Sequence, residues 1–100
     1  MKSESRSYRI PEGVFYQELD KESVLLNLAT EQYYSLDPVG TRIWQLLAKT
    51  ESIAATVAIM VTEYGIDDSI LQRDVEELVR KLIAKGLLAE LAGAANGTGS

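Results

Sequence analysis

LNLATEQYYSLDP, residues 26–38, is the stretch that decides the fold, because in it the chain changes from strands to helices. Apolar and aromatic residues lie on both sides of Ala29-Thr30-Glu31, a connection short enough for a hairpin. Asp37 followed by Pro38 is typical of a helix N-cap and first helical position. The stretch therefore predicts a strand, a turn, a second strand and the start of a helix.

Side-chain alternation assigns faces to the two strands of this hairpin. On the first strand, Val24, Leu26 and Leu28 share one face. On the second strand, residues 32–36, alternation places Gln32, Tyr34 and Leu36 on one face, and Tyr33 and Ser35 on the other. Upstream, Val14–Leu19 is a further apolar run that the polar turn Asp20-Lys21-Glu22 separates from Ser23–Leu28. We expect a three-stranded antiparallel meander.

The rest of the folded chain reads as three helices. The first runs from Pro38 to about Ala48, with an apolar stripe of Val39, Ile43, Leu46 and Leu47. Thr50 or Ser52 caps the second helix, and Gly65 ends it. Asp67 or Asp68 caps the third helix, and Gly86 ends it before an extended Leu87-Leu88. Strands followed by helices predict an α+β domain with the helices on one face of the sheet, and three helices with short turns fit a winged helix-turn-helix.

The ends of the chain bound this unit. Residues 1–7 are polar and we expect them to be flexible. The last nine residues, AGAANGTGS, have no apolar face, and we expect residues 92–100 to be a disordered tail. The folded domain is predicted to span residues 8–91.

Composition excludes several classes of function. The chain has no cysteine and no histidine, so thiol nucleophiles, imidazole bases and the usual zinc sites are missing. We interpret the carboxylates of the predicted third helix as a helix cap and a solvent-exposed face of the helix, rather than as a metal site. No segment resembles a membrane span or a signal peptide. We expect a cytoplasmic protein without catalytic activity, cofactor or metal.

A DNA-binding role is the rival reading of a winged helix-turn-helix outline. Such proteins place a basic helix in the major groove. Here Gln72, Arg73, Arg80 and Lys81 are mixed with carboxylates, and the formal net charge is -5. Carboxylates that face phosphates weaken binding, so we expect no nucleic-acid partner.

The sheet edge offers a different kind of surface. An open sheet ends in unpaired N–H and C=O groups, and residues 32–36 contain no proline or lysine to block pairing with another chain. Five residues span about 17 Å, enough to pair with a short extended peptide. The alternative is that Tyr33 and Tyr34 are half-buried strand residues whose hydroxyls reach water.

Residues 26–44, together with Asp74-Val75-Glu76-Glu77-Leu78 and Lys85-Gly86-Leu87-Leu88, resemble PqqD-like proteins over about residues 14–90. The resemblance implies a RiPP precursor recognition element, a domain that binds the leader of a ribosomally made precursor peptide as an extra strand and presents it to a modifying enzyme. The tyrosine pair resembles the free-standing proteins of lasso-peptide clusters, whose partner is a leader peptidase. Other members serve a radical enzyme in cofactor maturation.

Carried onto this chain, the resemblance implies two walls for the leader site. The docking strand would supply Gln32, Tyr33, Tyr34, Ser35 and Leu36, and the third helix would supply Leu71, Asp74, Val75, Leu78 and Arg80. The apolar members of the helix could equally belong to the core, and Asp74 and Arg80 could be ordinary solvated charges. A subunit that only stabilises a larger enzyme is a third possibility.

Overall fold

The sheet of this protein is a three-stranded antiparallel meander in the order β2-β3-β4. The computed structural model describes residues 7–91, in which β2 covers Val14–Leu19, β3 covers Glu22–Asn27 and β4 covers Gln32–Leu36. Leu25 is paired with Tyr16 on one side and with Tyr34 on the other, which fixes the register. The predicted meander is confirmed.

The core face of this sheet is not the one with the run of aliphatic residues. On β3 the buried side chains are Ser23, Leu25 and Asn27, whereas Val24 and Leu26 on the opposite face are only half-buried. The two buried polar residues have partners, because Ser23 Oγ lies 2.8 Å from Thr41 Oγ1 and Asn27 Nδ2 donates to the carbonyl of Gly86. Hydrogen bonding removes the penalty that burial of a polar group otherwise carries.

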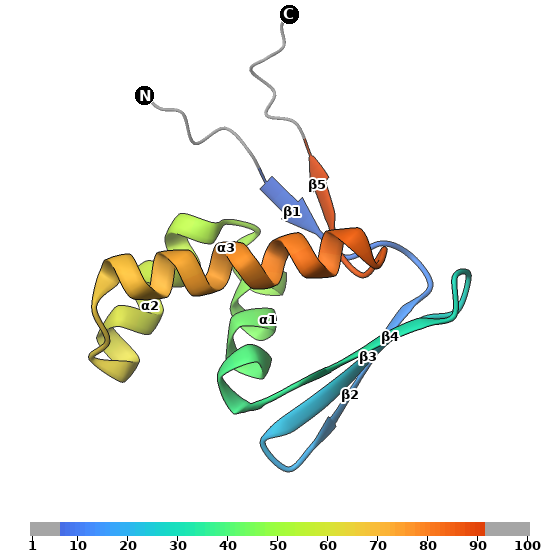
Figure 1. The fold of residues 1–100 in the computed structure, drawn as a ribbon, viewed down its shortest axis with the longest axis horizontal. Coiled ribbons are helices and arrows are strands. Elements are labelled where there is room, and N and C mark those ends of the chain that lie inside the picture. The colour runs from blue at the N-terminus through green and yellow to red at the C-terminus, as the bar shows by residue number, and fades with distance from the viewer. Residues whose placement is uncertain (1–6, 92–100) are drawn as a thin grey trace, which may run out of the picture.

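Three helices follow the meander, as predicted (Figure 1). Helix α1 spans Pro38–Thr50, α2 spans Ile53–Tyr64 and α3 spans Asp68–Ala84. Of the alternative caps, Ser52 accepts the amide of Ala55 at the start of α2, whereas Asp67 holds the N-cap position of α3 without a side-chain capping bond. The α+β class, with a three-stranded antiparallel sheet and three helices, is therefore confirmed.

The core lies between the inner face of the sheet and the helices. It includes Trp44 and Leu47 of α1, Met60 of α2 and Leu82 of α3, all 3% exposed or less. Tyr16 of β2 stacks on Trp44 with ring centroids 6.3 Å apart. Helix α1 thus packs against both the sheet and α2, and α2 in turn packs against α3.

A second, two-stranded sheet was not predicted. Strand β1, Ser7–Arg9, pairs antiparallel with β5, Ala89–Leu91, so that the two ends of the described chain lie side by side (Figure 1). Ser7, which we expected in the flexible segment, pairs with Leu91. The rest of that segment, residues 1–6, and the expected tail, residues 92–100, lie outside the described residues.

Candidate functional site

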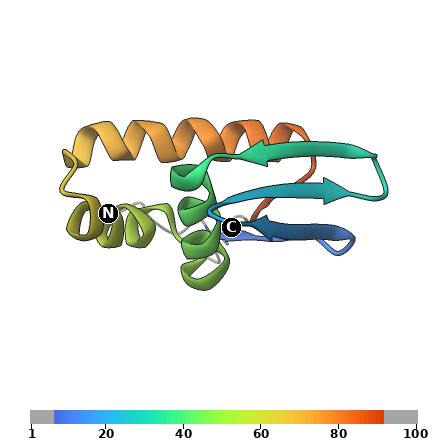
Figure 2. The ribbon, with the colours of Figure 1, turned by 90° about the horizontal axis from the view of Figure 1, so that it is seen from below.

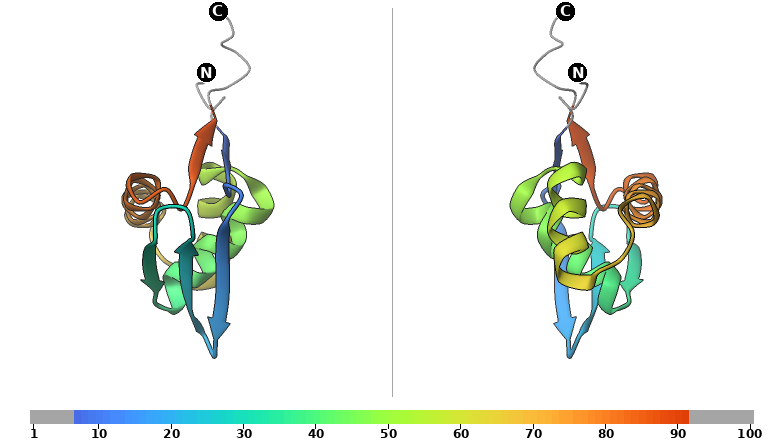
Figure 3. Two further views of the ribbon diagram at one scale, coloured as in Figure 1. Left: turned by 90° about the vertical axis from the view of Figure 1, so that its right-hand side faces the viewer. Right: turned by 90° about the vertical axis from the view of Figure 1, so that its left-hand side faces the viewer.

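Strand β4 is an edge strand that runs beside α3. Within residues 7–91 it pairs only with β3. Helix α3 lies on the β4 side of the sheet, and the two elements run in opposite directions (Figures 2 and 3). In an antiparallel pair, consecutive residues point their N–H and C=O groups alternately toward and away from the partner strand. Every second residue of β4 therefore has main-chain groups free to pair with another extended chain.

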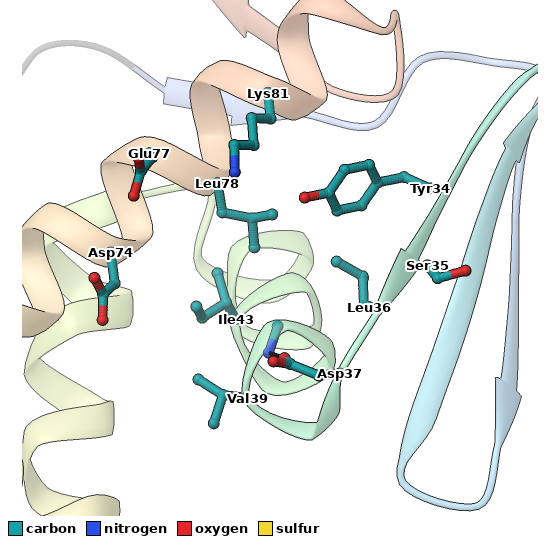
Figure 4. Close-up of a pocket in the computed structure, with 11 residues that line it drawn as sticks. Tyr34, Ser35, Leu36, Asp37, Val39, Ile43, Asp74, Glu77, Leu78 and Lys81 are labelled. Carbon is teal, nitrogen blue, oxygen red and sulfur yellow. Dashed lines mark hydrogen bonds between the residues drawn. The ribbon is translucent and has the colours of Figure 1, made fainter.

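A hollow of about 350 Å³ lies between β4, the start of α1 and α3, and we call it the β4–α3 groove (Figure 4). Its apolar floor consists of Leu36, Val39, Ile43 and Leu78, and its lining continues with Tyr34 and Ser35 of the edge strand. Leu36 and Ile43 are buried, whereas Val39 is 37% exposed, so the floor is anchored in the core and open above. The groove can accept an apolar side chain from a bound segment.

Charged side chains stand along the groove. Asp37, Asp74, Glu77 and Lys81 all line it. Asp37 also caps α1, because its Oδ1 accepts the amide of Gly40 at 2.7 Å. Three carboxylates therefore face one ammonium group, and no salt bridge joins Lys81 to any of the three.

A second hollow continues along the same strand toward the hairpin, and we call it the hairpin hollow. It is lined by Glu31, Gln32, Tyr33, Tyr34, Ser35 and Lys85 and has a volume of about 460 Å³. Tyr34 and Ser35 belong to both hollows, so the two follow each other along the free edge of β4. Together they give an extended segment room beside the whole strand.

The residues predicted on the strand all lie on this surface. Gln32 and Tyr33 line the hairpin hollow, Leu36 lines the groove, and Tyr34 and Ser35 line both. Tyr33 is 65% exposed and Tyr34 is half-buried, which is the alternation that the sequence predicts. The structure thus brings the five strand residues together at one edge.

The residues predicted on α3 are divided between the surface and the core. Asp74 and Leu78 line the groove. Leu71 and Val75 are 1% and 0% exposed and lie in the core, where a bound peptide cannot reach them without repacking. Arg80 is exposed but lines neither hollow. The uncertainty between core and groove is thereby resolved in favour of the core for two of the apolar residues.

Several lining residues were not predicted from the sequence. They are Asp37, Val39, Gly40, Ile43, Glu77 and Lys81 in the groove, and Glu31 and Lys85 in the hairpin hollow. Glu77 and Lys81 repeat at helical spacing with Asp74 and Leu78, so a face assignment for α3 could have found them. The contribution of α1 depends on how its first turn packs under Leu36, which no local pattern reveals.

A third, smaller hollow lies away from β4, and Arg42 and Tyr64 are among its lining residues. Beside it Arg42 Nε donates to Glu63 Oε1 at 2.9 Å. This hydrogen bond raises the pKa of Arg42 and lowers the pKa of Glu63 from its ordinary value. The pair connects α1 to α2 and is exposed, so we assign it no part in the site.

Comparison with known proteins agrees with this geometry. Residues 22–88, from β3 to the turn after α3, match the family described as coenzyme PQQ synthesis protein D (PqqD). The chain belongs to the PqqD family. The matched region contains both walls of the β4–α3 groove, so the candidate site lies within the part of this PqqD-family chain that carries the likeness.

Two solved structures resemble this PqqD-family chain. The structure described as "TbiB1 in Complex with the TbiA(beta) Leader Peptide" is 34% identical and has a TM-score of 0.75, with 92% of this chain and 99% of that chain covered. "Lasso peptide synthetase B1 complexed with the leader peptide" is 24% identical with the same TM-score, over 83% of this chain and 98% of that chain. A search of curated protein sequences gave no match.

Proposed function

We propose that this protein binds the leader region of a ribosomally synthesised precursor peptide by β-strand addition to β4. The observation that carries the proposal is the unpaired edge of β4 beside an open apolar groove. Main-chain pairing supplies affinity in this mode of recognition, and pockets for alternate side chains supply specificity. Two similar structures that hold leader peptides support the same ligand class.

Binding by addition of a strand uses both hollows at once. An extended segment paired with β4 would direct its alternate side chains to the inner face, toward Leu78 and Ile43. Its remaining side chains would lie on the outer face, next to the exposed ring of Tyr33. Because the inner side chains enter a groove with a core-anchored floor, they decide which peptide binds.

Presentation to a partner enzyme completes the proposed role. The domain has no histidine or cysteine, and we infer that it performs no chemistry itself. In a lasso-peptide pathway the partner would be a leader peptidase. The family match also supports a second candidate, a peptide chaperone for a radical maturation enzyme of the kind that serves cofactor synthesis. Both roles use the same groove and differ in the enzyme that receives the peptide.

We propose that the protein binds its leader peptide in the cytoplasm, where precursor peptides are made. Among the described residues, no helix is long and apolar enough to cross a bilayer. We also propose that the fold is of the winged helix-turn-helix type, with α2 and α3 joined through Gly65 as its helix pair. Binding of DNA would require α3 to approach phosphates with Asp74 and Glu77, which is electrostatically unfavourable.

Calorimetric titration tests the proposal with the leader peptide of the precursor encoded beside this protein. Proline has no N–H to donate to a neighbouring strand. A proline at a β4 residue whose N–H points away from β3 therefore abolishes binding without breaking the β3–β4 pair. Because the N–H direction alternates, Tyr34→Pro and Ser35→Pro together sample both orientations. Gln17→Pro, on the opposite edge strand β2, is the matched control. If the Tyr34 and Ser35 variants stay folded and bind with wild-type affinity, strand addition at β4 is wrong.

A further inference from the structure

Charge is distributed unevenly along the β4–α3 groove. Asp37 and Asp74 stand on the two sides of Val39 and Ile43 at one end, whereas Lys81 lies at the other end beside Leu78 and Tyr34 (Figure 4). The groove therefore has an acidic end at the start of α1 and a basic end toward the hairpin.

Local pairing does not remove the charge at the acidic end. Glu77 and Lys81 lie four residues apart on α3 and both line the groove, but no salt bridge joins them. The Asp74 side chain is exposed and makes no hydrogen bond or salt bridge to any residue of the described chain. The Asp37 carboxylate accepts one bond, from the amide of Gly40, and this uses only Oδ1. Two carboxylates thus remain available over an apolar floor.

From this arrangement we propose that the groove selects a leader segment in which a lysine or arginine lies two residues from the apolar anchor residue, on the same face of the extended chain. The inference rests on the proposed function and names the chemistry of the peptide. The apolar side chain occupies the floor at Ile43 and Leu78, and the basic side chain two positions along the segment lies between Asp37 and Asp74. A long basic side chain suits this place, because its stem can cover the exposed part of Val39 while its charge reaches the carboxylates.

The test uses a displayed library of random dodecapeptides, selected on the purified full-length protein. Peptides retained by the wild type are expected to contain a basic residue two positions from an apolar one. One selected peptide is then titrated against Asp37→Asn/Asp74→Asn, in which asparagine keeps the helix cap but removes both charges. We expect the affinity to fall about five- to tenfold, and to depend less on salt than in the wild type. Glu12→Gln/Asp20→Asn, a pair of exposed loop residues outside all three hollows, makes the same change in net charge and is the control.

The outcomes separate the two proposals. If the selected peptides bind and Ser35→Pro or Tyr34→Pro abolishes their binding, yet they show no basic preference or ignore the charge removal, the inference is overturned and strand addition stands. If no peptide binds the wild type, or if neither proline variant affects binding, the proposed function itself fails. Equal loss of affinity in the control variant would also overturn the inference, because the effect would then be one of net charge.

Discussion

The side-chain amide of Asn27 donates a hydrogen bond to the backbone carbonyl of Gly86, with Nδ2 and the oxygen 2.6 Å apart. Asn27 ends β3, and Gly86 follows α3, so this bond joins the hairpin that carries β4 to the helix that forms the other groove wall. The same side chain accepts the amides of Ala29 and Thr30 at 2.9 and 3.3 Å and so shapes the hairpin turn. One residue thus holds together the two walls of the proposed leader site.

Replacement of Asn27 by alanine should therefore affect both stability and binding. The variant leaves a partly buried carbonyl and two amides without this partner, and the expected loss in the free energy of unfolding is about 1–3 kcal/mol. Urea denaturation measures it. Asn27→Asp keeps the acceptor for the turn but places a carboxylate against the Gly86 carbonyl, so it should weaken leader binding as well. A midpoint equal to that of the wild type in both variants would show that the bond does not hold the walls.

Gly86 should tolerate a side chain poorly, for two separable reasons. It ends α3 in a left-handed conformation with φ +73°, and the bonds from Leu87 to Leu82 and from its own amide to Ile83 form a Schellman motif. A Cβ at this position would lie 3.3 Å from Asn27 Nδ2. Gly86→Ala should cost about 1–2 kcal/mol from backbone strain, with an additional cost from crowding.

Gly13→Ala separates these two contributions. Gly13 has a similar φ of +87°, but a Cβ there would meet no atom within 4 Å. Thermal or urea unfolding of both variants should show the larger loss at Gly86. Equal losses would mean that the contact with Asn27 is relaxed at no cost.

Two leucines of α3 should have different roles, because Leu71 stabilises the fold and Leu78 contributes mainly to leader binding. Leu71 is in the core, and Leu71→Ala should lower the free energy of unfolding by about 2–5 kcal/mol. Leu78 is half-buried in the groove, so Leu78→Ala should cost less stability, about 1 kcal/mol, while it weakens leader binding at least several-fold. Denaturation and peptide titration on both variants check this. Unchanged binding by Leu78→Ala would remove the helix wall from the account.

Acid should weaken the link between α1 and α2. Arg42 lowers the pKa of Glu63, so Glu63 binds a proton less readily in the folded state than in the unfolded state. Its contribution to stability is present above its ordinary pKa, near 4.5, and is lost as the pH falls through the lowered value. Urea unfolding between neutral pH and acid should show a smaller pH dependence in Glu63→Gln than in the wild type. An identical pH dependence would mean that the exposed pair is fully screened.

The sequence predicts the elements of this fold better than it predicts their faces. Asp37, Pro38 and Ser52 mark helix starts, and the short connection after β3 marks the hairpin, because such signals are local. Alternation correctly groups Val24 with Leu26, but it does not reveal that Ser23 and Asn27 take the buried face. Their partners, Thr41 and Gly86, are distant in sequence.

The same limit applies to the site. The edge of β4 could be predicted because it depends on five consecutive residues without a blocking side chain. The wall on α3 could not be divided into core and groove, because its apolar stripe is wider than the core needs. The pairing of β1 with β5 joins two three-residue strands at opposite ends of the described chain, and segments that short carry no periodic signal.

Amide hydrogen exchange of β4, measured by NMR with and without the leader peptide, tests the central claim most directly. The account predicts that the leader slows exchange at those amides of Gln32–Leu36 that point away from β3, while the amides of Val14–Leu19 on the opposite edge exchange as before. Binding of the peptide that leaves every β4 amide unchanged, or that protects Val14–Leu19 instead, would contradict it.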